Sequence, residues 1–128
     1  MLQDKEITDA IIGAAIEVHR ELGPGLLESA YQRCLLHELG LRGVHAAAEV
    51  PVDINYKGMS VEGGYRVDLL VEQRVVVEIK TVAEVLPVHE AQLLTYMRLS
   101  GCQTGLLLNF KTKLLRDGIL RRVLRLER

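Results

Sequence analysis

The chain has 128 residues, 48% of them hydrophobic and 26% charged, which suffices for one good hydrophobic core but not for two. The net charge of −1 excludes the strongly basic balance of a dedicated nucleic-acid module. Two cysteines far apart in sequence, Cys34 and Cys102, exclude a disulfide framework or a zinc site. The first residues lack a secretion signal and no run is apolar enough to span a membrane, so we expect a cytoplasmic protein without membrane partners.

The charge is unevenly distributed. Residues 111–128 carry seven basic and two acidic side chains, a net charge of +5, against −6 over the rest of the chain. This basic segment could contact phosphates or could form a solvated edge strand, and the sequence supports both interpretations equally.

Two helices are predicted first. Residues 4–22 place apolar side chains at three- and four-residue spacing, which indicates an amphipathic helix. The sequence Gly23-Pro-Gly25 ends it, because proline cannot continue a helix and glycine allows a sharp reversal. A second helix is expected over 27–41, where Glu28 either favours the helix N-terminus electrostatically or belongs to a site. Its inward stripe is predicted to comprise Leu27, Ala30, Tyr31, Cys34, Leu35, Glu38 and Leu39.

From Val44 the apolar period changes to two, which is typical of strands. Residues 44–55 are expected to form a strand interrupted at Pro51, since proline favours an edge position or a bulge. A turn at 56–58 and a short returning strand at 59–62 follow, and we expect a meander of three or four strands that includes the next hairpin.

Two alternating runs between Tyr65 and Lys80 predict a β-hairpin. A two-residue loop would put the apolar rows of the two strands on different faces. A three-residue loop at 72–74 instead pairs Val71 with Val75 and Asp68 with Glu78. One face is then wholly apolar, including Val67, Leu69 and Val71, and the other carries both carboxylates.

Opposed carboxylates repel each other, so the pair calls for a cation. Mg²⁺ prefers oxygen ligands and typically uses one or two protein carboxylates together with waters and a substrate phosphate. Lys80 reaches over the same face and could hold or deprotonate a metal-bound water. The alternative interpretation is a solvated polar face of an amphipathic hairpin.

The remaining elements alternate between helix and strand. Residues 89–100 predict a helix with Ala91, Leu94, Thr95 and Leu99 on its apolar face. Residues 103–110 predict a buried strand parallel to a neighbour, and residues 119–126 predict a last edge strand. The order of elements implies an α/β domain with a mixed sheet flanked by helices.

Several polar residues could converge on the hairpin carboxylates. Gln92 and Tyr96 lie one helical turn apart and could orient a phosphate or the lysine, and Glu28 could add a carboxylate. A carboxylate-bound Mg²⁺ or Mn²⁺ would neutralise a phosphodiester transition state and supply hydroxide. The histidines have no mutual metal-ligand spacing and are interpreted as surface or packing residues, with His89, near Gln92, as the exception to follow.

These motifs resemble those of a known superfamily. The pattern Asp68-x₉-Glu78-x-Lys80 resembles the signature of the PD-(D/E)XK nucleases, with Val67 where the family name has proline. Gly25-Leu-Leu-Glu28-Ser-Ala-Tyr31 is similar to the motif of the small GxxExxY proteins within it, and Gln92-Leu-Leu-Thr-Tyr96 is similar to a QxxxY element. The resemblance extends over nearly the whole chain.

The resemblance implies a restriction-endonuclease-like fold, with a mixed central β-sheet flanked by helices, over residues 1–128 as a single domain. It implies a divalent-metal-dependent nuclease, using Mg²⁺ or Mn²⁺, in which a metal-bound water attacks a phosphodiester bond. The implied catalytic residues are Asp68, Glu78, Lys80, Gln92 and Tyr96, and the implied metal ligands are Glu28, Asp68 and Glu78.

Nucleic acid is the expected partner, with DNA favoured over RNA. The alternative is a catalytically silent module of the same fold that binds nucleic acid or another protein. A homo-oligomer in which the apolar first helix packs across a two-fold axis is compatible with either function.

Overall fold

The structure is a computed structural model that describes residues 4–125. The helices are α1 (Asp4–Leu22), α2 (Glu28–Leu41), α3 (Pro87–Ser100) and the short 3₁₀ helix η1 (Leu115–Gly118). The strands are β1 (Ala46–Pro51), β2 (Ile54–Tyr56), β3 (Met59–Val61), β4 (Arg66–Val71), β5 (Val75–Lys80), β6 (Thr104–Asn109) and β7 (Ile119–Val123). The predicted α/β class is confirmed, and only η1 has no counterpart among the predicted elements. The predicted last strand ends at Val123, and its final residue, Leu126, lies outside the described residues.

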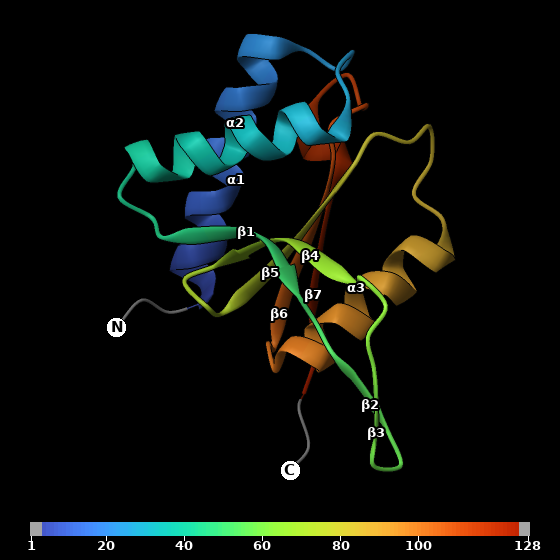
Figure 1. Ribbon diagram of the computed structural model, residues 1–128. Helices are drawn as coiled ribbons and strands as arrows, with labels where there is room; N and C mark the ends of the chain where they lie inside the picture. The colour runs from blue at the N-terminus through green and yellow to red at the C-terminus, as the bar shows by residue number, and fades with distance from the viewer. Residues whose placement is uncertain (1–3, 126–128) are drawn as a thin grey trace.

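Five strands form one mixed sheet in the order β1-β4-β5-β6-β7. Only the pair β5–β6 is parallel, and α3 makes the crossover between these two strands. The interior strand β6, between β5 and β7, is buried along its whole length, as its apolar sequence predicted. Helices α1 and α2 cover one face and α3 covers the other, so the sheet separates two helical layers (Figure 1).

Each layer has its own core. The apolar side chains of α1, including Ile7, Ile11 and Val18, pack with those of α2 against β4, β5 and β6. The apolar face of α1 is therefore buried in the core of the same chain. This is the face that was expected to pack across a two-fold axis in a homo-oligomer. On the other layer, Leu93 and Met97 of α3 pack against the sheet.

Two predicted helix faces are wrong in detail. The buried side chains of α3 are Leu93, Tyr96 and Met97. The expected stripe began at Ala91, which is exposed. The prediction was wrong because α3 has apolar residues around much of its surface, so periodicity alone could not identify the buried face. In α2 the expected stripe included Leu27, yet this residue precedes the helix and is 78% exposed.

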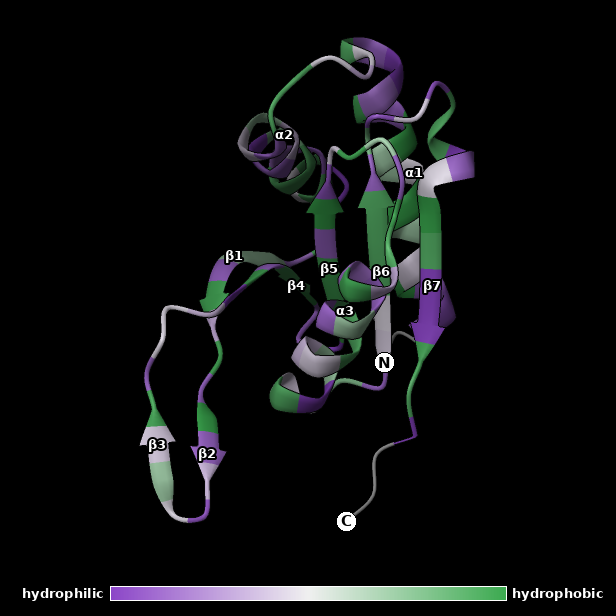
Figure 2. Ribbon diagram, turned by 90° about the vertical axis from the view of Figure 1, so that its right-hand side faces the viewer, coloured by the Kyte–Doolittle hydropathy of each residue, from purple (hydrophilic) through white to green (hydrophobic). Residues whose placement is uncertain are grey.

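The expected meander is interrupted. β1 pairs directly with β4, whereas β2 and β3 form a separate two-stranded ribbon that extends away from the main sheet in both views (Figure 1, Figure 2). A tight turn joins β2 to β3, with positive φ at Lys57 and Gly58 (49° and 87°), as a two-residue hairpin loop requires. Along β1, Glu49 also has a positive φ of 55°, and Pro51 ends the strand.

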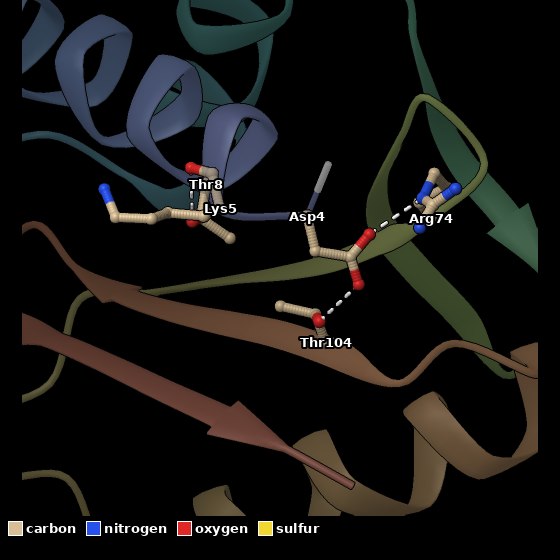
Figure 3. Close-up of polar contacts among 5 residues, drawn as sticks. All are labelled: Asp4, Lys5, Thr8, Arg74 and Thr104. Atoms are coloured by element: carbon tan, nitrogen blue, oxygen red, sulfur yellow. Dashed lines mark hydrogen bonds and ion pairs between the residues drawn. The ribbon is translucent and has the colours of Figure 1, made fainter. Parts of the chain in front are cut away.

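Asp4 connects the start of α1 to the sheet (Figure 3). Its carboxylate accepts hydrogen bonds from Arg74 Nε and from Thr104 Oγ1, both at 2.7 Å. Burial alone would raise the pKa of Asp4, but these hydrogen bonds and the charge of Arg74 outweigh burial and hold the pKa below its ordinary value. One carboxylate thus joins the first helix, the turn between β4 and β5, and the first residue of β6.

Candidate active site

The hairpin of β4 and β5 has the predicted register. Val71 pairs with Val75 and Leu69 with Val77, which confirms the three-residue loop over 72–74. Two of its residues, Glu72 and Gln73, have positive φ values of 53° and 55° and make the reversal. The same register would place Asp68 opposite Glu78, but the backbone pairing stops at Leu69 and Val77.

One part of the face prediction is wrong. Leu69 and Val71 lie in the core beneath α1 and α2, but Val67 belongs to the core beneath α3. The backbone pairing of β4 skips Asp68 on both of its sides, and Glu49, which would face it from β1, has its left-handed conformation there. The strand therefore departs from regular alternation at Asp68 itself, and the apolar side chain before it lies with the other core.

The two carboxylates replace the missing backbone pairing. The N–H of Asp68 donates to Oε2 of Glu78 at 3.0 Å, and the N–H of Ile79 donates to Oδ2 of Asp68 at 2.8 Å. The other oxygen of each carboxylate has no hydrogen-bond partner among residues 4–125. Each side chain is therefore fixed by one oxygen and keeps the second available for a ligand.

The pair is electrostatically strained. Burial and the neighbouring charge of Asp68 raise the pKa of Glu78 to about 8. Burial also raises the pKa of Asp68, against the opposing effects of the Ile79 N–H and the Lys80 charge. Glu78 is only 3% exposed, so solvent screens a charge there poorly, and a cation bound between the carboxylates would favour the ionised form of both.

A polar chain connects β5 to α3 beside these carboxylates. Lys80 Nζ donates to Oε1 of Gln92 at 2.9 Å, and Nε2 of Gln92 donates to the hydroxyl of Tyr96 at 3.4 Å. Gln92 thus fixes the lysine head group. The Tyr96 hydroxyl donates to no residue in the described part of the chain and keeps its proton for a ligand. Burial, followed by the charge of Glu78, raises the pKa of Tyr96 and keeps the hydroxyl protonated.

Glu28 approaches from the first residue of α2. Its Oε2 accepts a hydrogen bond from the N–H of Thr81 at 3.3 Å, directly after Lys80. The charge of Glu28 contributes to the raised pKa values of both Asp68 and Glu78. All six residues singled out from the sequence therefore gather at the end of β5, from four different elements.

Tyr31 holds the loop that carries Glu28. Its ring is fully buried and stacks on Phe110 with a centroid distance of 4.4 Å. Its hydroxyl donates to the carbonyl oxygen of Gly23 and accepts from the N–H of Leu26. The tyrosine, one turn after the glutamate, therefore closes the reversal between α1 and α2 and sets where α2 begins.

The donor set suits a divalent ion that retains waters. Within residues 4–125, no three His, Cys, Asp or Glu side chains form a group that could enclose a metal ion. The half-buried Asp68 and the buried Glu78 nevertheless offer two free carboxylate oxygens, which matches the way Mg²⁺ uses one or two protein carboxylates with waters and a phosphate. Glu28 is committed in part to Thr81.

The structure reveals one contributor that the sequence did not suggest. Asn109 ends the apolar strand β6 and is 2% exposed. Its side chain accepts from the N–H groups of Val82 and Lys111 and donates to the carbonyl of Val82. It holds the segment after Lys80, and a single amide at the end of an apolar run was the available signal. His89, in contrast, caps α3, since its Nδ1 accepts from the N–H of Leu86.

The described part of the chain contains no helix that is long and apolar enough to cross a membrane.

A mixed five-stranded sheet between two helical layers, with two carboxylates and a lysine on adjacent strands, defines the restriction-endonuclease-like class. Comparison with known proteins gives the family: the model of the PD-(D/E)XK nuclease superfamily matches residues 5–123, and the chain belongs to this superfamily. Nucleases of this superfamily generally use divalent metals.

Two further comparisons were made. A search of curated proteins finds no match. Among solved structures, the crystal structure of SSO0001 is similar, with a TM-score of 0.55, 22% sequence identity, and coverage of 94% of this chain and 67% of that chain. This similarity extends to the fold.

Proposed function

We propose that the chain is a nuclease that uses Mg²⁺ or Mn²⁺ to hydrolyse phosphodiester bonds in DNA. The observation that carries the proposal is the pair formed by the half-buried Asp68 and the buried Glu78, each with one oxygen free, next to a lysine fixed by Gln92. A bound divalent ion would stabilise charge on the transition state and lower the pKa of an attacking water.

The protein groups would share the remaining work. Asp68 and Glu78 would hold the ion, because ion binding removes their mutual repulsion. Lys80 would donate to a phosphate oxygen or to the attacking water from the position that Gln92 gives it. Tyr96 would donate its unused proton to the phosphate. Among the residues that the structure describes, Glu28 is not grouped with Asp68 and Glu78 as a third metal ligand; it would instead hold the backbone after Lys80 through the N–H of Thr81.

The test is cleavage of supercoiled DNA, linear duplex, single-stranded DNA and RNA with Mg²⁺, Mn²⁺ or EDTA. We expect metal-dependent cleavage by wild type and none by Asp68→Asn or Lys80→Met. The control is Glu62→Gln, which changes an exposed carboxylate directly after β3 and should leave cleavage unchanged. Failure to cleave any substrate, or cleavage that survives both site variants, would contradict the proposal.

A second candidate is a catalytically silent module that binds nucleic acid or a protein. The lack of three converging metal ligands among residues 4–125 favours it. In that case nucleic-acid affinity would fall steeply with salt but would not respond to metal or to Asp68→Asn. Calorimetric Mn²⁺ binding that Asp68→Asn abolishes would count against this candidate.

We further propose that the chain is a single domain of the GxxExxY group. The contacts of Tyr31 support this, because the tyrosine of that motif fixes the reversal from which α2, with the glutamate of the motif as its first residue, begins. The free thiols of Cys34 and Cys102 fit the reducing conditions of the cytoplasm.

A further inference from the structure

A second cavity lies between the end of α1 and the loop that follows β6. Its volume is about 570 Å³, its floor includes Ile16, Pro24 and Leu115, and basic side chains of Arg20, Lys113 and Arg116 line it. No acidic side chain lines the cavity. We refer to these six residues as the basic cleft.

The positive charges of the basic cleft are largely unneutralised. Lys113 and Arg116 are exposed and form no ion pair with any residue between 4 and 125. Arg20 contacts Glu17 at 3.5 Å, but its side chain is 71% exposed, and such surface pairs are weak. The cleft therefore suits an anionic ligand.

Both walls of the cleft continue into the candidate active site. Along one wall, Pro24 and Glu28 are four positions apart in the sequence, so their Cα atoms lie at most about 14 Å apart. Along the other wall, Asn109 pairs with Lys80 and binds the backbone of both Val82 and Lys111. A ligand at the carboxylates could therefore extend into the cleft.

The cleft is held in shape by hydrogen bonds between its walls. His19, near the end of α1, donates from Nε2 to the carbonyl oxygen of Thr112 at 2.8 Å, and His19 is 8% exposed. Thr112 Oγ1 in turn donates to the carbonyl oxygen of Asn109 at 2.9 Å. The basic loop is thereby attached to α1 before any ligand binds, which lowers the entropy cost of binding.

We propose that the basic cleft binds the phosphodiester backbone of a nucleic acid whose reacting phosphate lies at Asp68, Glu78 and Lys80. This inference rests on the proposed function. Lysine and arginine on the rim would contact phosphates, and the apolar floor would accept sugars. No Phe, Tyr or Trp side chain is among the residues that line the cleft, so the proposed contacts are with phosphates and sugars, which carry no sequence information.

The experiment compares Lys113→Gln/Arg116→Gln with a matched control, Arg33→Gln/Arg98→Gln, which removes the same charge from exposed positions on α2 and α3. The probe is a fluorescein-labelled oligonucleotide, single-stranded and duplex, titrated in EDTA between about 50 and 200 mM salt. We expect the cleft variant to bind about ten-fold more weakly, with a salt slope reduced by about 1.5 to 2, and the control to bind like wild type.

Equal losses in the cleft variant and the control, or no loss in either, would overturn the inference. The inference would also be overturned if wild type binds polyglutamate, the cleft variant does not, and both bind the oligonucleotide equally. That result would identify a site for an acidic peptide. Cleavage is measured separately. If wild type cleaves in a metal-dependent way and the cleft variant binds the oligonucleotide as wild type does, the proposed role of the cleft is refuted and the proposed nuclease activity is not. If the cleft variant binds more weakly but wild type does not cleave, the proposed nuclease activity is refuted and nucleic-acid binding by the cleft is supported.

Discussion

Replacing Glu78 by glutamine should stabilise the metal-free protein at neutral pH. The substitution keeps the shape of the side chain and an oxygen that can accept the N–H of Asp68, but glutamine cannot ionise in either the folded or the unfolded state. The ordinary pKa of a glutamate is 4.5, and burial and Asp68 raise the pKa of Glu78 to about 8.

The pKa shift sets the size and direction of the effect. The folded state holds the proton more tightly than the unfolded state, so stability falls as pH rises between the two pKa values. Because the unfolded glutamate ionises while the folded one keeps its proton, the raised pKa of Glu78 costs about 1 kcal/mol of folding free energy at pH 5 and about 3 kcal/mol at pH 7, as upper values. The glutamine variant lacks this cost, so its advantage over wild type should grow by about 2 kcal/mol over that interval.

The assay is urea unfolding in EDTA at a series of pH values, with Glu62→Gln as the control. Adding Mn²⁺ should reverse the order at neutral pH, because the ion binds the folded wild type and stabilises it by mass action, whereas the variant has lost a ligand. A glutamine variant that is less stable than wild type in EDTA at pH 7, with a difference independent of pH, would refute the electrostatic reasoning.

Two other substitutions test the supports of the site. Tyr31→Phe keeps the stack on Phe110 but leaves two backbone groups of the reversal without partners, so we expect a loss of about 1 to 3 kcal/mol in urea unfolding and slower cleavage; unchanged stability would contradict this. Asp4→Asn weakens the contacts with Arg74 and Thr104, and we expect a loss of about 1 kcal/mol at neutral pH. Because the pKa of Asp4 is lowered, this difference should vanish as pH falls through that pKa; a difference that persists in acid would point to another cause.

The register of the site hairpin could be predicted because two independent constraints agree. Alternation predicted the faces, and only an odd-length loop put the apolar rows together, as the pairing of Val71 with Val75 and of Leu69 with Val77 confirms. Val67 was misplaced because the strand is irregular at Asp68, and that irregularity depends on side-chain contacts with Glu78, which periodicity does not contain.

Other features depend on tertiary structure. The buried face of α3 was predicted wrongly because Leu93 and Met97 are no more apolar than their neighbours, and only the position of β6 selects them. Asn109 fell inside the predicted strand over 103–110 and was given no role, because its contacts with Val82 and Lys111 depend on the parallel pairing with β5. The basic segment after residue 111 was recognised as a charge cluster, but the cleft needs α1 as its second wall.

The irregular edge strand β1 also affects how copies of this chain can meet. An unpaired strand edge is a template for further pairing and for aggregation. On β1, Glu49 leaves the extended conformation and Pro51 has no N–H to donate, while at the other edge β7 carries Arg121 and Arg122 along its five residues. Both edges of the sheet therefore disfavour pairing with a further strand. Any assembly of this protein, with itself or with a partner, should therefore use its helices, its loops or the β2–β3 ribbon, and should not extend the sheet.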